Sequence, residues 1–145
     1  MSIKPAYTTT AVATGGRDGR SRTLDGGLDV KLAPPKELGG NANGNNPEQL
    51  FAAGYAACYL GAMKFAATQD ASLPKVPDDA TVEATVGIGP RPDKGFGLTV
   101  ALKVNLPGVA AEAAERLTEA GHGICPYSHA TKGNIEVTTE LGTVD

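Results

Sequence analysis

The chain has 145 residues, 41% of them hydrophobic, which is the usual size of one domain and enough to bury a single core. Its 13 basic and 16 acidic residues give a net charge of −3 without a long run of either sign, which argues against a nucleic-acid partner. We read no signal segment at the start and no stretch that approaches the roughly 20 apolar residues needed to span a bilayer. We therefore expect one soluble, cytoplasmic domain over residues 1–145 with no membrane association.

The first part of the chain is predicted to form short strands. Residues 7–14 alternate Thr with small apolar residues, and the glycine-rich turn at 15–19 that follows them predicts an opening hairpin. Residues 28–32 alternate apolar and charged side chains, as a half-buried strand does, and two prolines end it. Residues 33–46, rich in Asn and Gly, are then a loop.

A long helix is predicted over residues 47–68. Asn46 is a favourable N-cap, Pro47 suits the first helical position, and Glu48 complements the positive end of the helix dipole. Large apolar side chains are spread around the whole circumference of this helix. We therefore expect a buried helix that is covered on nearly every side, in part by a second subunit.

The second half of the chain contains strands and one more helix. Residues 81–88 and 98–106 are predicted strands joined by a turn-rich connection. A helix is predicted over residues 109–121, ended by the glycines that follow its last turn, and a last strand over residues 135–141. The order of strands, helix, strands, helix and strand favours an α+β fold.

The two cysteines are candidates for redox chemistry, but they lie too far apart for a local CxxC motif, so folding must unite them. Cys58 lies mid-helix among apolar residues, where burial raises the pKa of a thiol and makes it inert unless a cation offsets the effect. An ordinary core cysteine is the alternative. Cys125 precedes Pro126 in a segment with turn character, where mobility would suit a resolving thiol, and a packed loop thiol is the alternative.

Arg17 and Glu48 are candidate supporting charges. Arg17 lies in the glycine-rich turn and could project toward a thiolate or a peroxide oxygen, although a solvated surface arginine is the commoner case. Glu48 is equally explained by the helix dipole. Because Glu48 and Cys58 lie about 15 Å apart along one helix, a shared site needs at least one group from elsewhere. A homodimer with antiparallel long helices would supply it.

Metal binding is a weaker possibility. His122, Cys125 and His129 lie within eight residues and could join Cys58 around zinc, but their spacing matches no strong zinc pattern, so we expect no metal site. The two histidines are more simply a cation at a helix C-terminus and a polar loop residue.

Several segments form a pattern that spans almost the whole chain, and the stretch from Asn46 to Cys58 is the most specific of them. They are Tyr7-Thr8, Thr14-Gly15-Gly16-Arg17-Asp18-Gly19, Leu28-Asp29-Val30-Lys31-Leu32, Glu37-Leu38-Gly39-Gly40, Asn46-Pro47-Glu48-Gln49-Leu50-Phe51-Ala52-Ala53-Gly54-Tyr55, Ala57-Cys58 and Cys125-Pro126-Tyr127-Ser128. This pattern resembles the organic hydroperoxide resistance (Ohr) proteins, a branch of the OsmC-like superfamily. Lys132 and His129 stand where that branch is expected to carry Arg and Asn, a departure that concerns the docking surface and not the redox residues.

The resemblance implies an OsmC-like α+β fold, with antiparallel sheets packed around a long buried central helix in an intertwined homodimer. It implies a cysteine-based organic hydroperoxide reductase in which Cys58 matches the peroxidatic cysteine and Cys125 the resolving one. Arg17 matches the arginine that stabilises the thiolate and orients the peroxide, and Glu48 matches the glutamate that holds it. No bound cofactor is implied, and the family's usual electron donor is a reduced lipoyl group carried on a protein.

The expected reaction converts alkyl or fatty acid hydroperoxides to alcohols through a Cys58 sulfenic acid and a Cys58–Cys125 disulfide. An apolar pocket would favour such substrates, since each buried methylene contributes roughly 0.8 kcal/mol. Phe51, Phe96 and Met63 are candidate lining residues, with ordinary core packing as the alternative for Met63. Two other functions remain open: a non-catalytic protein that binds an apolar ligand, and a structural domain stabilised by zinc.

Overall fold

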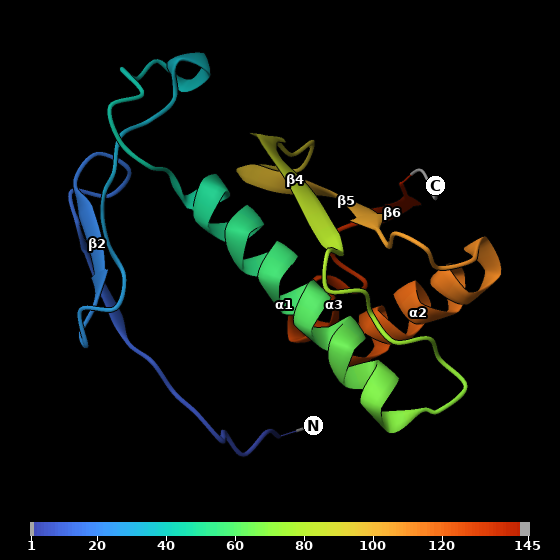
Figure 1. Cartoon of the computed structure of the whole chain (residues 1–145). Helices are drawn as coiled ribbons and strands as arrows, with labels where there is room; N and C mark the ends of the chain where they lie inside the picture. Colours follow the sequence, from blue (N-terminus) through green and yellow to red (C-terminus); the bar gives the residue numbers. More distant parts are fainter. Residues whose placement is uncertain (1, 143–145) are drawn as a thin grey trace. The chain divides into compact units, whose positions relative to one another are not determined.

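The computed structural model describes residues 2–142. The chain divides into two compact units, Met1–Leu50 and Phe51–Asp145, and each is described by itself, so the single domain expected from the length stays a prediction. The fold is α+β, as predicted. In chain order the elements are β1 (Ala11–Thr14), β2 (Arg20–Thr23), β3 (Asp29–Lys31), the 3-10 helix η1 (Lys36–Leu38), α1 (Pro47–Gln69), β4 (Thr81–Pro90), β5 (Phe96–Asn105), α2 (Ala111–Ile124), α3 (Pro126–Thr131) and β6 (Val137–Leu141) (Figure 1).

The first unit contains a three-stranded antiparallel sheet in the order β1-β2-β3. The opening hairpin and the strand after it are confirmed, although the first strand begins at Ala11 and not at residue 7. The turn between β1 and β2 requires glycine: Gly15 and Gly16 have φ angles of 73° and 63°, and a Cβ on Gly19 would collide with the Thr14 carbonyl. This turn holds Arg17 between two paired strands.

Helix α1 begins as the sequence predicts. The Gln49 N–H donates to Asn46 Oδ1 at 2.9 Å, and the Asn46 N–H donates to Gln49 Oε1 at 3.1 Å. This reciprocal pair is a capping box, which satisfies two backbone donors at the start of the helix. The predicted N-cap at Asn46 is therefore confirmed, and Glu48 occupies the first turn.

The second unit contains a three-stranded sheet in the order β4-β5-β6. Strands β4 and β5 pair antiparallel over their full length, as the predicted hairpin requires. Strand β6, however, runs parallel to β5, so the expectation of purely antiparallel sheets is wrong for this sheet. The reason is the crossover formed by α2 and α3, which returns the chain toward the end of the sheet at which β5 begins, so that β6 runs in the same direction as β5.

Helix α2 continues past the glycines that were expected to end it. It runs from Ala111 to Ile124, with Gly121 and Gly123 inside it. A Cβ at Gly121 would lie 2.7 Å from Met63 Cγ and 3.2 Å from Tyr59 Cε2 of α1. Gly121 is therefore a point of close approach between two helices. In the sequence alone, the same glycine indicated the end of a helix.

Substituting Gly121 by Ala is expected to destabilise the protein by about 1–3 kcal/mol, because the added methyl overpacks the contact with α1. Gly123→Ala is the matched control on the same helix, since a Cβ at position 123 meets nothing within 4 Å. The substitution also replaces a conformationally flexible glycine. Urea unfolding of both variants measures the difference. Equal midpoints for the two variants would contradict the packing role.

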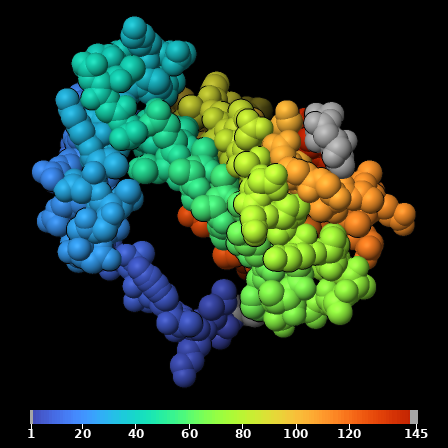
Figure 2. Space-filling model, in the orientation of Figure 1, coloured from blue at the N-terminus to red at the C-terminus, as the bar shows by residue number. Residues whose placement is uncertain are grey.

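The core of the second unit forms where one side of α1 meets α2 and the inner side of the sheet. The buried residues of α1 follow one stripe at helical spacing; they are Tyr55, Tyr59, Ala62, Met63 and Ala66. Within this unit the helix is therefore buried along one stripe, and the predicted cover by a second subunit stays a prediction. Ala57 and Gly61 are exposed on the other side, and Phe65 is 54% exposed. Figure 2 shows the green atoms of α1 open at the surface.

The length and composition of α1 are sufficient for a membrane span, with a mean hydropathy of 1.3, although no such stretch was expected from the sequence. The core helix of a soluble protein passes the same test. The buried stripe on α1 packs against α2 and the sheet, which is the behaviour of a core helix.

Candidate active site

Two sulfur atoms lie next to each other in the second unit. Cys58 is at the middle of α1, Cys125 lies directly before α3, and their Sγ atoms are 3.6 Å apart with both thiols free. Cys125 is only 1% exposed, whereas Cys58 is partly open to solvent. A small molecule arriving from solvent therefore meets Cys58 first, and Cys125 is already within reach of it.

The residues that flank Cys125 suggested a mobile loop, but Cys125 lies at the start of a helix. It is the N-cap of α3, where Pro126 takes the first helical position and the Ser128 N–H donates to Cys125 Sγ at 3.5 Å. The proline was read as a turn residue, although a proline also suits the first position of a helix. That second reading, with Cys125 as the cap, would have found this short helix and Ser128 from sequence.

The surroundings of Cys58 disfavour its thiolate. Burial raises the pKa of the Cys58 thiol above its ordinary value, and the neighbouring Cys125 thiol adds to the rise. The backbone N–H of Tyr127 donates to Cys58 and offsets part of this effect. Among the described residues of its own unit, no cation lowers the pKa of Cys58, although a reactive thiolate needs a nearby positive charge. Sequence analysis did not single out Tyr127, because a backbone donor leaves no trace in side-chain chemistry.

Arg17 and Glu48 form a two-pronged ion pair in the first unit. Arg17 Nη1 donates to Glu48 Oε2 at 3.0 Å, and Nη2 donates to Oε1 at 2.6 Å. This hydrogen-bonded pairing lowers the pKa of Glu48 and raises that of Arg17, so both stay charged near neutral pH. The structure thus brings Arg17 to Glu48 and Cys58 to Cys125.

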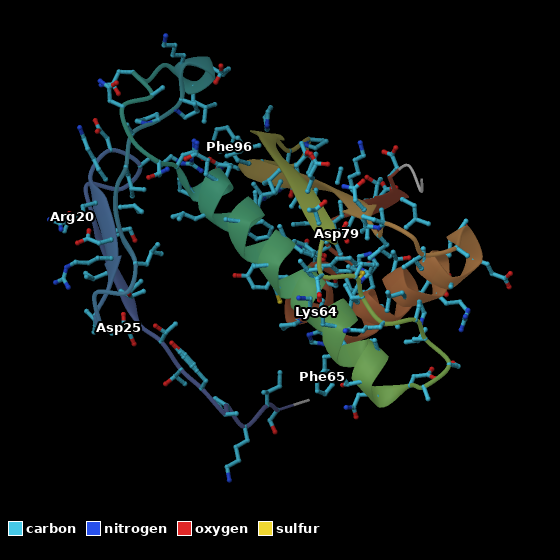
Figure 3. The ribbon with its side chains drawn as sticks, viewed as in Figure 1. Arg20, Asp25, Lys64, Phe65, Asp79 and Phe96 are labelled. Carbon is cyan, nitrogen blue, oxygen red and sulfur yellow. The ribbon has the colours of Figure 1, made fainter. Side chains whose placement is uncertain are left out.

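The three candidate lining residues have different surroundings. Phe51 packs against Tyr55 and Tyr127, with ring centroids 6.1 Å and 5.8 Å away. Phe96, at the start of β5, is 68% exposed (Figure 3). Met63 is fully buried in the core, which favours its structural alternative. The substrate roles of Phe51 and Phe96 stay predictions.

The zinc alternative gains no support from the residues described. Within residues 2–142, no group of three or more His, Cys, Asp and Glu side chains could hold a metal ion. Both ring nitrogens of His122 are instead hydrogen-bonded to the hydroxyls of Ser128 and Thr139.

Comparison with known proteins agrees with this geometry. Residues 39–140 match the family model of OsmC-like proteins. The chain is 50% identical to the organic hydroperoxide resistance protein of Xanthomonas axonopodis pv. citri, over 95% of this chain and 96% of that one.

Two solved structures with the same description share the fold. An organic hydroperoxide resistance protein from Elizabethkingia anophelis superposes with a TM-score of 0.88 at 45% identity, covering 97% of this chain and 99% of that chain. OhrB of Bacillus subtilis gives a TM-score of 0.84 at 39% identity, covering 95% of this chain and 100% of that one. The chain therefore belongs to the OsmC-like family and, within it, to the organic hydroperoxide resistance branch.

Proposed function

We propose that this protein is a thiol peroxidase that reduces organic hydroperoxides to alcohols. The Cys58 thiolate attacks the terminal peroxide oxygen, the O–O bond breaks, and the alcohol leaves after taking up a proton. Cys58 is then a sulfenic acid, which the Cys125 thiol attacks to give a disulfide and water. An external dithiol restores both thiols.

The arrangement of the two sulfurs carries this proposal. A separation of 3.6 Å is an encounter distance for a disulfide, which needs a bond of about 2.0 Å and only a small movement from here. The difference in exposure supports the proposed order of the steps, since the partly exposed Cys58 is accessible to peroxide and the buried Cys125 is not. Two free thiols that served only as core residues would have no need of either feature.

Arg17 is proposed to supply the positive charge that Cys58 lacks. A guanidinium beside the thiolate would lower the pKa of Cys58 and stabilise the negative charge that passes to the peroxide oxygen. Glu48 would act on the chemistry only by holding that guanidinium through its two hydrogen bonds. This division of roles predicts unequal effects of removing the two residues.

The reductant is proposed to be a dithiol of the lipoyl class carried on a protein, with no cofactor bound to the chain itself. Apolar hydroperoxides, such as alkyl and fatty acid hydroperoxides, are the proposed substrates, because apolar side chains around the site gain free energy with each methylene they cover. The family resemblance supports both assignments. We place the protein in the cytoplasm on the same basis.

A homodimer is proposed as the working form. The open side of α1 bears small residues, such as Ala57 and Gly61, beside the exposed ring of Phe65. Small residues allow two helices to approach closely, and an apolar helix face left in water is unfavourable. Sedimentation of the purified protein tests this: a dimer mass is expected, and a stable monomer at micromolar concentration contradicts it.

The test of the catalytic proposal is a stoichiometric titration of the reduced protein with cumene hydroperoxide. One equivalent of peroxide is expected to remove both thiols and to produce a Cys58–Cys125 disulfide, identified by peptide mass. A reduced dithiol should then return both thiols. Unchanged thiols in the presence of intact peroxide would overturn the proposal and favour a non-catalytic binding protein, whose ligand affinity would survive loss of both cysteines.

A further inference from the structure

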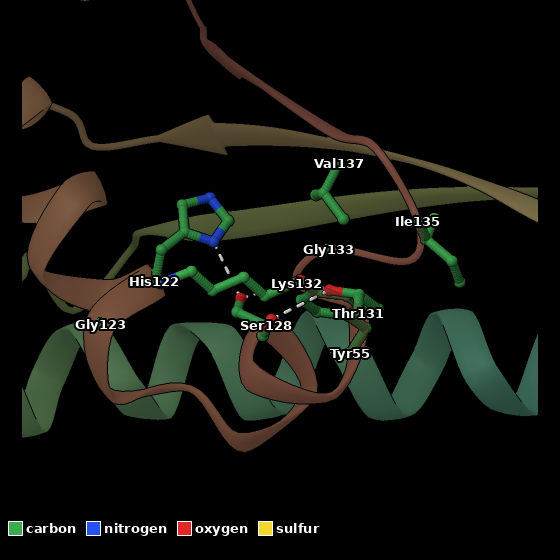
Figure 4. A pocket seen from close by; sticks show the side chains of 9 residues that line it. All are labelled: Tyr55, His122, Gly123, Ser128, Thr131, Lys132, Gly133, Ile135 and Val137. Atoms are coloured by element: carbon green, nitrogen blue, oxygen red, sulfur yellow. Dashed lines mark hydrogen bonds between the residues drawn. The ribbon is translucent and has the colours of Figure 1, made fainter.

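A chain of polar side chains lies beside Cys125, and the reaction above does not use it. His122 Nδ1 and Ser128 Oγ are hydrogen-bonded at 2.8 Å, and Tyr55 OH lies 2.8 Å from the same Ser128 oxygen (Figure 4). His122 Nε2 is hydrogen-bonded to Thr139 Oγ1 at 2.7 Å. We call these four residues, Tyr55, His122, Ser128 and Thr139, the hydroxyl–imidazole chain. It links α1, α2, α3 and β6.

The inner part of this chain is buried. Tyr55 is fully buried and Ser128 is 8% exposed, and the Tyr55 hydroxyl has a second partner in Thr131 Oγ1 at 3.4 Å. The three buried hydroxyls therefore satisfy one another, beside a cavity of about 420 Å³. Buried hydroxyls in an otherwise apolar core need such partners, and their geometry is consequently well defined.

Ser128 connects this chain to the sulfur pair. Its side chain is held by Tyr55 and His122, while its backbone N–H donates to Cys125 Sγ at 3.5 Å. The backbone of Tyr127, the residue before Ser128, lies close enough to Cys58 to lower the pKa of its thiol. One turn of α3 thus contacts both sulfurs, and the hydroxyl–imidazole chain anchors that turn to the rest of the unit.

Two reactions compete for the Cys58 sulfenic acid. In the first, Cys125 Sγ attacks the Cys58 sulfur, the S–O bond breaks, and the hydroxyl leaves as water with the proton of the Cys125 thiol. In the second, the sulfenic acid sulfur attacks another hydroperoxide, whose O–O bond breaks to give a sulfinic acid and an alcohol. Because Cys125 is buried and cannot swing in from solvent, its rate of attack depends on where it is already held.

We propose, on the basis of the proposed function, that Tyr55, His122 and Ser128 are positioning residues that hold Cys125 against Cys58. Formation of the disulfide is then faster than oxidation of Cys58 to the sulfinic acid. These residues do not contact the peroxide. Their loss should leave the first attack by Cys58 nearly unchanged and slow only the second step.

The variants are Ser128→Ala and Tyr55→Phe. The first removes the oxygen shared by Tyr55 and His122 but keeps the backbone N–H to Cys125, and the second removes one hydroxyl and keeps the ring. Tyr59→Phe is the matched control, because Tyr59 is also fully buried on α1 but its hydroxyl donates to the Thr118 carbonyl and not to a member of the hydroxyl–imidazole chain. The Tyr59 ring packs against His122 at a centroid distance of 4.7 Å, and phenylalanine keeps that ring. Ser128→Thr retains a hydroxyl and serves as the rescue.

The measurement is the product mixture after a pulse of excess cumene hydroperoxide on each reduced protein, without reductant. Mass spectrometry separates the disulfide form, which has lost two hydrogens, from the sulfinic form, which has gained two oxygens. We expect the ratio of sulfinic acid to disulfide to rise about tenfold in Ser128→Ala and Tyr55→Phe and to stay at the wild-type value in Tyr59→Phe and Ser128→Thr. Thermal melts confirm that each variant compared is folded.

The outcomes separate this inference from the proposed function. If the wild-type protein closes its disulfide but Tyr55→Phe and Ser128→Ala give no more sulfinic acid than Tyr59→Phe, the positioning role is wrong and the peroxidase proposal stands. If the wild-type protein consumes no peroxide, both are wrong. An equal rise in all three variants would indicate general loosening of the core and would also overturn the positioning role.

Discussion

Cys58→Ser is expected to lose reduction of cumene hydroperoxide by roughly a thousandfold or more, because a hydroxyl in place of the thiolate is a far weaker nucleophile at neutral pH. The measurement is peroxide consumption with excess dithiothreitol as the dithiol. The side chain of Cys58 is partly exposed, so serine is tolerated there, and the melting temperature should change little.

Cys125→Ala provides the contrast. This variant should still react once with peroxide, since its Cys58 is intact, and should then accumulate a sulfenic acid that dimedone captures. Alanine is preferred to serine because it leaves neither a nucleophile nor a hydrogen-bonding group beside the Cys58 sulfur. If Cys58→Ser reacted once with peroxide and Cys125→Ala did not, the roles assigned from exposure would be reversed.

Arg17→Met is expected to slow the reaction of Cys58 with peroxide by about a hundredfold, with little change in global stability. The sign of the pH effect follows from charge. A nearby cation stabilises the thiolate and lowers the pKa of Cys58, so removing the cation lets burial raise that pKa. Iodoacetamide alkylation of Cys58, measured in a Cys125→Ala background, should therefore shift to higher pH in Arg17→Met.

Arg20→Met is the matched control for that experiment. Arg20 forms a similar two-pronged pair, with its Nε 2.6 Å from Asp29 Oδ1, in the strand that follows the Arg17 turn. Its loss removes the same charge from the same sheet and should leave the alkylation profile unchanged. Identical profiles for Arg17→Met and Arg20→Met would rule out a specific role of Arg17.

Glu48→Gln should have a smaller effect than Arg17→Met, because the guanidinium keeps its charge and loses only its anchor. The comparison uses the same peroxide assay. A loss equal to that of Arg17→Met would mean that the position of the guanidinium matters as much as its presence.

Much of the site could be predicted from the sequence, because the signals for its local structure lie in short stretches of the chain. The Asn46 N-cap, Pro47 at the first helical position and the apolar run after them predicted α1, which carries Cys58, within one residue of its end. The glycine turn that holds Arg17 was also predicted, since its backbone geometry is open mainly to glycine. Such signals involve residues only a few positions apart.

Other features were misread for a physical reason. Gly121 was taken as a helix stop, whereas its missing side chain makes room for Met63 and Tyr59 of another helix. Cys125 was taken as mobile, whereas α3 and the anchored Ser128 fix it. In both cases the decisive contact joins segments far apart in the chain, and no local pattern records it.

By itself, the sequence determined the α+β class, the extent of the long helix and the four redox candidates, because propensity, capping and family motifs act through neighbouring residues. Only the tertiary structure decided that the two sulfurs lie 3.6 Å apart, that Cys125 is the buried one, and that β6 runs parallel to β5. These properties arise from the packing of distant segments against one another, which fixes distance and burial after the local structure has formed.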